Sequence, residues 1–184
     1  EAARMARATE QGFTIDAYKG AYPYDYNTGP VYAYKNGKMV AIERAGSFPE
    51  ELSNFQTPDK PYAGFFAEDP EVANRFASLF SEGAVFPAKL KMENPVIIDA
   101  KGKPAAAFQF DSAAQKHGTL SQFEQYKAAL DSPDNDGVII QNTSDEGTIF
   151  IPKKARQIRS RHAVFASDSA DSPDMLASGG FPAI

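Results

Sequence analysis

The sequence contains no cysteine, and only two of its 184 residues are histidine. The lack of cysteine excludes disulfides, thiolate zinc sites, iron–sulfur ligation and a cysteine nucleophile. His117 and His162 stand apart, without the paired spacing that holds a metal ion, and we therefore expect no metal site. No apolar run approaches the roughly 20 residues that a membrane span requires, so we expect no contact with a membrane.

Other familiar signatures are also missing. No serine stands in a nucleophile elbow, and no glycine-rich loop precedes a helix pattern as a phosphate-binding loop would. The chain carries 24 acidic and 19 basic residues, a formal net charge of −5. This balance disfavours nucleic acid as a partner of the whole chain, because such binding depends on neutralising phosphates.

The chain is long enough, and at 42% hydrophobic residues apolar enough, to form one domain with a core of its own. We predict a domain over residues 1–165, followed by a flexible polar tail over 166–184 that is rich in serine, aspartate and glycine. The first residues lack the apolar stretch of a signal peptide. We expect the chain to be a module of a longer protein.

Helical and alternating patterns are interspersed along the chain, which predicts an α+β fold with antiparallel pairing. Asp69 and Pro70 suit the start of a helix, and Asn36-Gly37 suits a hairpin turn. Residues 101–118 show only a weak pattern. We expect helices over 1–12, 70–83 and 119–130, and strands over 14–18, 31–34, 39–42, 61–67, 84–92, 96–99, 137–141 and 148–151.

Three segments stand out together by their order. The first is the strand end Tyr18-Lys19-Gly20-Ala21. The second is Gly64-Phe65-Phe66-Ala67, followed by a helix that carries Phe76, eleven residues after Phe65. The third runs from Asn135-Asp136-Gly137-Val138-Ile139, through a polar loop, to Gln157-Ile158-Arg159-Ser160.

In this order the three segments resemble the ADP-ribosyltransferase superfamily, most closely the small domains found in phage and mobile-element polyvalent proteins and in bacterial effectors. The resemblance covers roughly residues 5–178. It implies a split antiparallel β-sandwich with flanking helices and NAD as the substrate, bound between two small sheets. It also implies mono-ADP-ribosylation of a protein target. The reaction would take place in a bacterial or host-cell cytoplasm, and the enzyme would be a toxin or effector that is secreted or encoded by a phage.

The resemblance also suggests roles for individual residues. Gly20 would let the backbone approach the nicotinamide carboxamide, beside Tyr18. Phe65 and Phe76 would stack against the nicotinamide ring, and Phe66 is a further NAD-binding candidate. At least one of the adjacent Phe65 and Phe66 should belong to the core, because neighbours on a strand face opposite sides. Lys19 stands where relatives carry histidine or arginine, and it keeps a positive charge without the planar geometry.

The catalytic acid is less directly indicated. In the family it commonly opens the next-to-last core strand, where this chain has Thr148. We rank Glu146 first, Asp136 second and Asp145 third as the carboxylate that stabilises the positive charge on the ribose.

Each of these residues also has a purely structural interpretation. Lys19 and Glu146 fit solvated positions, the phenylalanines fit a core, and Asp136-Gly137 fits a turn. The basic segment 153–162 fits a solvated face as well as ligand contacts. The tyrosines between 18 and 34 fit local packing as well as ligand contacts. Two rival functions remain: an NAD glycohydrolase, and a non-catalytic NAD- or protein-binding module, which Lys19 and Thr148 favour.

Overall fold

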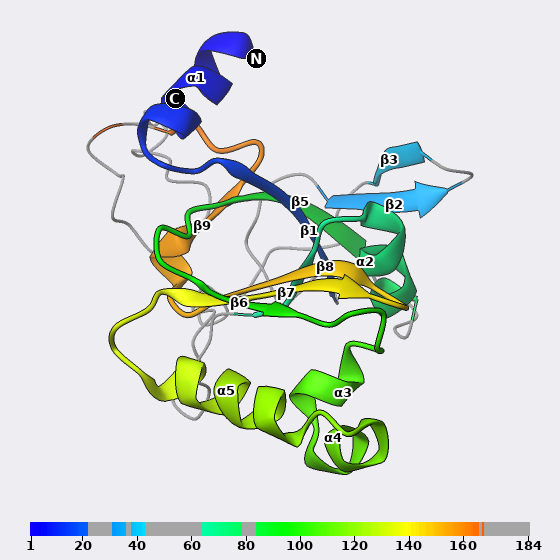
Figure 1. Ribbon diagram of the computed structural model, residues 1–184. Coiled ribbons are helices and arrows are strands. Elements are labelled where there is room, and N and C mark those ends of the chain that lie inside the picture. Colours follow the sequence, from blue (N-terminus) through cyan, green and yellow to red (C-terminus); the bar gives the residue numbers. More distant parts are fainter. Residues whose placement is uncertain (22–30, 36–37, 43–63, 79–83, 166, 168–184) are drawn as a thin grey trace, which may run out of the picture.

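The computed structural model describes residues 1–21, 31–35, 38–42, 64–78, 84–165 and 167. These residues form an α+β fold in which nine strands make one connected sheet and five α-helices lie around it (Figure 1). The predicted tail and most of the tyrosine-rich segment lie outside the described residues.

The sheet has two parts that meet at a very short strand. The path β3-β2-β5-β1 is joined through the two residues of β4 to β8-β7-β6, and β9 pairs with β5. In Figure 1 the strands of the first part run at an angle to those of the second. The strands are β1 (Ile15–Ala21), β2 (Val31–Lys35), β3 (Lys38–Ile42), β4 (Phe66–Ala67), β5 (Ala84–Leu90), β6 (Val96–Asp99), β7 (Gly137–Thr143), β8 (Gly147–Pro152) and β9 (Ile158–Ser160).

The helices cover different regions of this sheet. The helix α1 lies at one end of the molecule, α2 packs on β1 and β5, and α3, α4 and α5 lie together below β6, β7 and β8 in the view of Figure 1. A short 3-10 helix (Ala155–Gln157) precedes β9. The α-helices are α1 (Ala2–Glu10), α2 (Pro70–Ala77), α3 (Ala106–Gln109), α4 (Asp111–His117) and α5 (Leu120–Asp131).

Two local predictions are confirmed. The β2–β3 hairpin pairs Lys35 with Lys38, the register that a two-residue turn gives. The helix α2 begins as its sequence indicates, because the Asp69 carboxylate accepts a hydrogen bond from the backbone N–H of Glu71 at 2.8 Å and Pro70 occupies the first helical position.

Three features differ from the sequence-based expectation. Residues 101–118, whose weak sequence pattern predicted no element, contain α3 and α4. The strands β6 and β7 run parallel, since α3, α4 and α5 form a crossover between them, so the sheet is mixed rather than wholly antiparallel. The predicted two separate sheets are one continuous network of pairs through β4.

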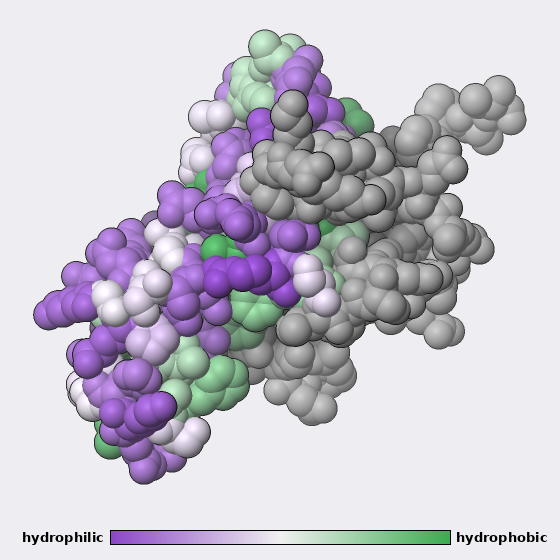
Figure 2. Space-filling model, turned by 90° about the vertical axis from the view of Figure 1, so that its right-hand side faces the viewer, coloured by the Kyte–Doolittle hydropathy of each residue, from purple (hydrophilic) through white to green (hydrophobic). Residues whose placement is uncertain are grey.

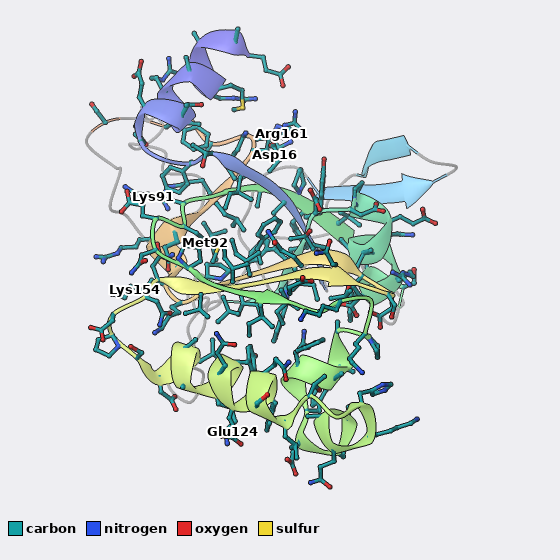
Figure 3. The ribbon with its side chains drawn as sticks, in the orientation of Figure 1. Asp16, Lys91, Met92, Glu124, Lys154 and Arg161 are labelled. Carbon is teal, nitrogen blue, oxygen red and sulfur yellow. The ribbon has the colours of Figure 1, made fainter. Side chains whose placement is uncertain are left out.

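The side chains of β7 and β8 pack into a hydrophobic core on each face. Ile139 and Phe150 face the cluster to which β1 and β5 contribute, whereas Ile140 and Ile149 face the cluster between the sheet and α5. This follows from the two-residue repeat of a strand. Figure 3 shows side chains filling the space between the strands and α5, with Glu124 pointing outward from that helix. The two central strands are therefore fixed on both sides.

Candidate functional site

A cavity of about 280 Å³ opens where β4 joins the two parts of the sheet. Of the nine residues that the sequence singled out as catalytic or NAD-binding, all but Asp136 and Asp145 line it, from β1, β4 and the residue before it, α2 and the turn before β8. Figure 2, turned toward the side of α2, shows hydrophobic atoms reaching the surface among hydrophilic ones. The lining residues are Tyr18, Lys19, Gly20, Phe65, Phe66, Ala67, Ala73, Phe76, Ala106, Gln109, Phe110, Glu146 and Ile149.

The strand β1 brings three adjacent residues to this cavity. Tyr18 packs against the small apolar cluster under α2. The Lys19 ammonium lies 6.0 Å from the centre of the Phe66 ring, within the range of a cation–π contact. A Cβ on Gly20 would lie 1.8 Å from the carbonyl oxygen of Ala73. Glycine at position 20 therefore lets α2 approach β1, which is a packing role that the sequence did not indicate.

The three phenylalanines differ in what they contribute. Phe66 is 1% exposed and belongs to the main core, so only part of it can face a ligand. Phe65 is partly buried beside the second core. Phe76, which also fitted a core position, is 43% exposed, whereas Val72 and Ala73 of the same helix are buried. A large exposed aromatic ring at the edge of a cavity suits contact with a ligand.

Glu146 lies in the turn between β7 and β8, and that turn holds it firmly. Its backbone N–H donates to the Thr143 hydroxyl at 3.0 Å, and the Asp145 carboxylate accepts from the N–H of Ala105 at 2.9 Å. The Arg75 guanidinium donates to the carbonyl of Asp145. These contacts attach the turn to α2 on one side and to the segment before α3 on the other.

The electrostatics of Glu146 follow from its surroundings. Burial, and next the nearby Asp145 carboxylate, raise the pKa of Glu146 above its ordinary value, while the Arg75 charge partly opposes them. The Glu146 carboxylate makes no hydrogen bond with a described residue. A partly desolvated anion in this position is best stabilised by a positive charge brought by a ligand.

A second cavity of about 290 Å³ meets the first at Glu146. It is more polar, and it extends beside the first turn of α2 and the β7–β8 turn. Its other lining residues are Asp69, Glu71, Val72, Arg75, Ser144, Asp145 and Gly147. Glu146 therefore lines both an apolar cavity and a polar one.

Asp136, ranked second as the acid, lies elsewhere. It precedes β7, whereas Glu146 follows it, so the length of that strand, about 20 Å, separates them. Its carboxylate accepts backbone N–H bonds from Glu93 and Asn94, and its carbonyl accepts from Lys153 and Gln157. The turn interpretation thus describes Asp136 better than the catalytic one.

The basic segment 153–162 also has structural partners. The Lys153 ammonium donates to the carbonyls of Ala129 and Ser132 at the end of α5, and burial lowers the pKa of Lys153. Arg159 is fully buried and lies 5.0 Å from the centre of the Phe13 ring. None of the six basic or titratable groups of this segment lines the first cavity.

Sequence reasoning missed the contribution of residues 106–110 to the cavity. Ala106, Gln109 and Phe110 line it, and they come from a segment with little helical periodicity. Two signals in the sequence could have indicated these helices. Pro104 comes shortly before α3, and Gly118 follows Lys116-His117 at the end of α4. Glycine often ends a helix in the left-handed conformation, and the φ of Gly118 is 68°.

Among the residues that the structure describes, no group of three or more histidine, aspartate or glutamate side chains is placed to hold a metal ion. Within those same ranges, no helix is long and apolar enough to cross a bilayer. Comparisons with protein-family models, with curated protein sequences and with solved structures give no match to this chain.

Proposed function

We propose that this chain binds NAD⁺ in the first cavity and transfers its ADP-ribose to a side chain of a protein target. The observation that carries the proposal is the convergence of residues 18–20, 65–76 and 146 on that cavity. These segments were selected from the sequence because of their resemblance to ADP-ribosyltransferases. Their spatial proximity supports the resemblance, because segments chosen for an unrelated reason would not be expected to meet.

The chemistry of the cavity fits this reaction. Cleavage breaks the bond between the ribose anomeric carbon and the nicotinamide nitrogen, and the bonding electron pair leaves with nicotinamide. Positive charge then develops on the ribose, where the Glu146 carboxylate would stabilise it. Phe65 and Phe76 would contact the nicotinamide ring. The Lys19 ammonium would contact ribose or phosphate oxygens.

The second cavity supports transfer because it gives the nucleophile a separate way to reach the ribose. The nucleophile must meet the anomeric carbon while nicotinamide still occupies the apolar cavity. A polar cavity that shares Glu146 provides such an approach. When the nucleophile attacks, its lone pair forms the new bond to the anomeric carbon, and its proton is released.

The arrangement of the sheet supports the finer fold assignment. An ADP-ribosyltransferase fold has two small sheets with the ligand between them. Here two parts of one sheet meet through the two residues of β4, and the cavity lies at that junction. We propose that this junction corresponds to the cleft of the split sandwich.

The test is nicotinamide release from NAD⁺ by the wild type and by Glu146→Gln and Asp136→Asn variants. We expect Glu146→Gln to lower the rate by about 100-fold or more, as for other groups that stabilise developing charge. Asp136→Asn retains an oxygen acceptor for the turn and should keep the wild-type rate. Equal rates in all three proteins would show that Glu146 is not the acid.

Mass spectrometry of candidate target proteins incubated with NAD⁺ and the chain separates transfer from hydrolysis. Covalent addition of ADP-ribose to a target is expected. Release of nicotinamide with free ADP-ribose alone would instead identify an NAD glycohydrolase.

A non-catalytic module is the second candidate, and Thr148 favours it. This residue, the second of β8, stands at the position where relatives carry the acid, while Lys19 replaces a planar cation. Calorimetry with NAD⁺ distinguishes the two candidates. Binding without nicotinamide release would identify a binding module, and no binding would contradict both the enzyme and the NAD-binding module.

A further inference from the structure

The corner between α3 and α4 places an unusually exposed aromatic ring at the first cavity. Phe110 is 59% exposed, the largest value among the exposed large hydrophobic residues that the structure describes. Phe76, the other exposed phenylalanine among them, lines the same cavity from α2. Leaving two such rings in water is unfavourable unless a ligand covers them. Two rings from separate elements provide contacts for a flat ligand.

The backbone holds this corner in place. Phe110 is extended, with φ −130° and ψ 131°, and so separates the two helices. Its N–H donates to the carbonyl of Ala106 at 3.1 Å, and its carbonyl accepts from Ala114 at 2.9 Å. The neighbouring Phe108 is 1% exposed and anchors the corner in the core beneath the sheet. Phe110 is therefore presented by a rigid support.

Gln109 adds a polar group to a mainly apolar cavity. Its side chain is partly buried, and its amide makes no hydrogen bond with a described residue. This amide is not fully buried and keeps access to solvent, so its donor and acceptor are available to a ligand. A second amide is its natural complement, because each has one carbonyl acceptor and one NH₂ donor and the two can pair reciprocally.

We propose that Gln109 and Phe110 determine the specificity of the cavity for nicotinamide: Gln109 pairs with the carboxamide, and Phe110 and Phe76 cover the ring. This inference rests on the proposed function. It also predicts discrimination against a carboxylate in place of the carboxamide, because a carboxylate cannot donate to the Gln109 carbonyl and would be repelled by Glu146.

Calorimetry with three ligands tests the inference: NAD⁺, nicotinic acid adenine dinucleotide, which carries a carboxylate, and ADP-ribose, which lacks the ring. The wild type should bind NAD⁺ about tenfold more tightly than the carboxylate analogue. Gln109→Leu, of similar volume, should abolish that preference. Phe110→Ala should weaken NAD⁺ binding about tenfold. Neither substitution should change the affinity for ADP-ribose.

Gln115→Leu is the matched control, because Gln115 lies on α4, bonds the Asp111 carboxylate at 2.9 Å and does not line the cavity. This variant should bind all three ligands as the wild type does. The inference would be overturned if Gln109→Leu kept the wild-type preference for NAD⁺. It would also be overturned if either variant lost as much affinity for ADP-ribose as for NAD⁺. Both results would leave the proposed function standing. Failure of the wild type to bind any of the three would overturn the proposed function itself.

Discussion

Burial and two charged neighbours, Asp145 and Arg75, set the charge state of Glu146. Burial and Asp145 favour the protonated acid, while Arg75 favours the carboxylate. Catalysis through charge stabilisation needs the carboxylate. The rate of nicotinamide release should therefore rise with pH as Glu146 loses its proton, and the midpoint should lie above the ordinary glutamate pKa of 4.5.

Two substitutions should move this midpoint in opposite directions. Arg75→Gln removes the opposing positive charge and should shift the acid limb of the rate profile to higher pH. Asp145→Asn removes a negative neighbour and should shift the limb to lower pH. The measurement is the initial rate of nicotinamide release from NAD⁺ as a function of pH. A limb that stays in place in both variants would show that another group controls the rate.

Gly20 gives a prediction about stability. A methyl group at this position collides with the backbone of α2, and backbone cannot yield as a flexible side chain can. Gly20→Ala should lower the free energy of unfolding by about 3 kcal/mol, as overpacking commonly does. Gly102→Ala is the control, because Gly102 has a φ of 75° and open space around it, so it should cost about 1 kcal/mol. Equal costs in urea unfolding would contradict the collision.

The end of β7, which leads into the turn that carries Glu146, is hydrogen-bonded to the end of β6. The Asp99 carboxylate accepts hydrogen bonds from the Asn142 amide and from the N–H of Lys101, both at 3.0 Å. The bond from Asn142, and next that from Lys101, lower the pKa of Asp99 below 3.8. The ionised form therefore stabilises the fold above that pH, and this contribution is lost as pH falls through the lowered pKa.

Asp99→Ala should consequently affect the site from a distance. Without the Asn142 contact, the end of β7 that leads into the turn is held less tightly, so Glu146 is positioned less well and nicotinamide release should fall about tenfold. Asp16→Ala is the control, since Asp16 is exposed and pairs with Lys89 at 3.0 Å on β1 and β5. It should keep the wild-type rate. Full activity of Asp99→Ala would show that the turn is held without it.

Elements with strong local signals were predictable, and those held by tertiary contacts were not. The Asp69 cap and the Asn36-Gly37 sequence pair are signals confined to a few residues, so the sequence alone indicates α2 and the pairing of β2 with β3. The helices α3 and α4 are short, and the extended Phe110 separates them, so no apolar repeat extends across both. Their formation depends on packing beneath the sheet, which a local pattern does not encode.

In the candidate site, too, some features could be predicted from the sequence and others depend on tertiary contacts. The resemblance to ADP-ribosyltransferases, which rests on short motifs, pointed to Lys19 and Glu146, whereas the residues alone fit solvated positions. The rank given to Asp136 came from its Asp-Gly pair, whose turn geometry accounts for the pair without catalysis. The burial of Phe66 and the exposure of Phe76 depend on which element covers each ring, and only the assembled fold decides that.

At the scale of the whole molecule, α1 and the residues after it pack against residues near the end of the described chain. The Phe13 and Phe165 rings meet edge to face with centroids 5.6 Å apart, and Gln11 donates to the carbonyl of Phe165 at 2.8 Å. Ala8 and Ala163 complete this cluster. Figure 1 shows α1 well away from α2 and α3. The cluster thus contributes to stability without taking part in the cavity.

Phe13→Ala should therefore separate stability from ligand binding. Removing a fully buried ring should lower the free energy of unfolding by roughly 4 kcal/mol. The affinity for NAD⁺ should stay at the wild-type value at temperatures where the variant is folded. Thermal melting and calorimetry on the same samples measure both quantities. A selective loss of affinity in the folded variant would show that α1 communicates with the cavity.

The parallel crossover between β6 and β7 reaches both the cavity and the turn that carries Glu146. Its residues Ala106, Gln109 and Phe110 line one side of the cavity. Its Ala105 N–H also donates to the Asp145 carboxylate in the turn. A change in the length of this crossover should therefore alter the cavity wall and the position of Glu146 together, whereas the pairing of β1 with β5 lies outside it.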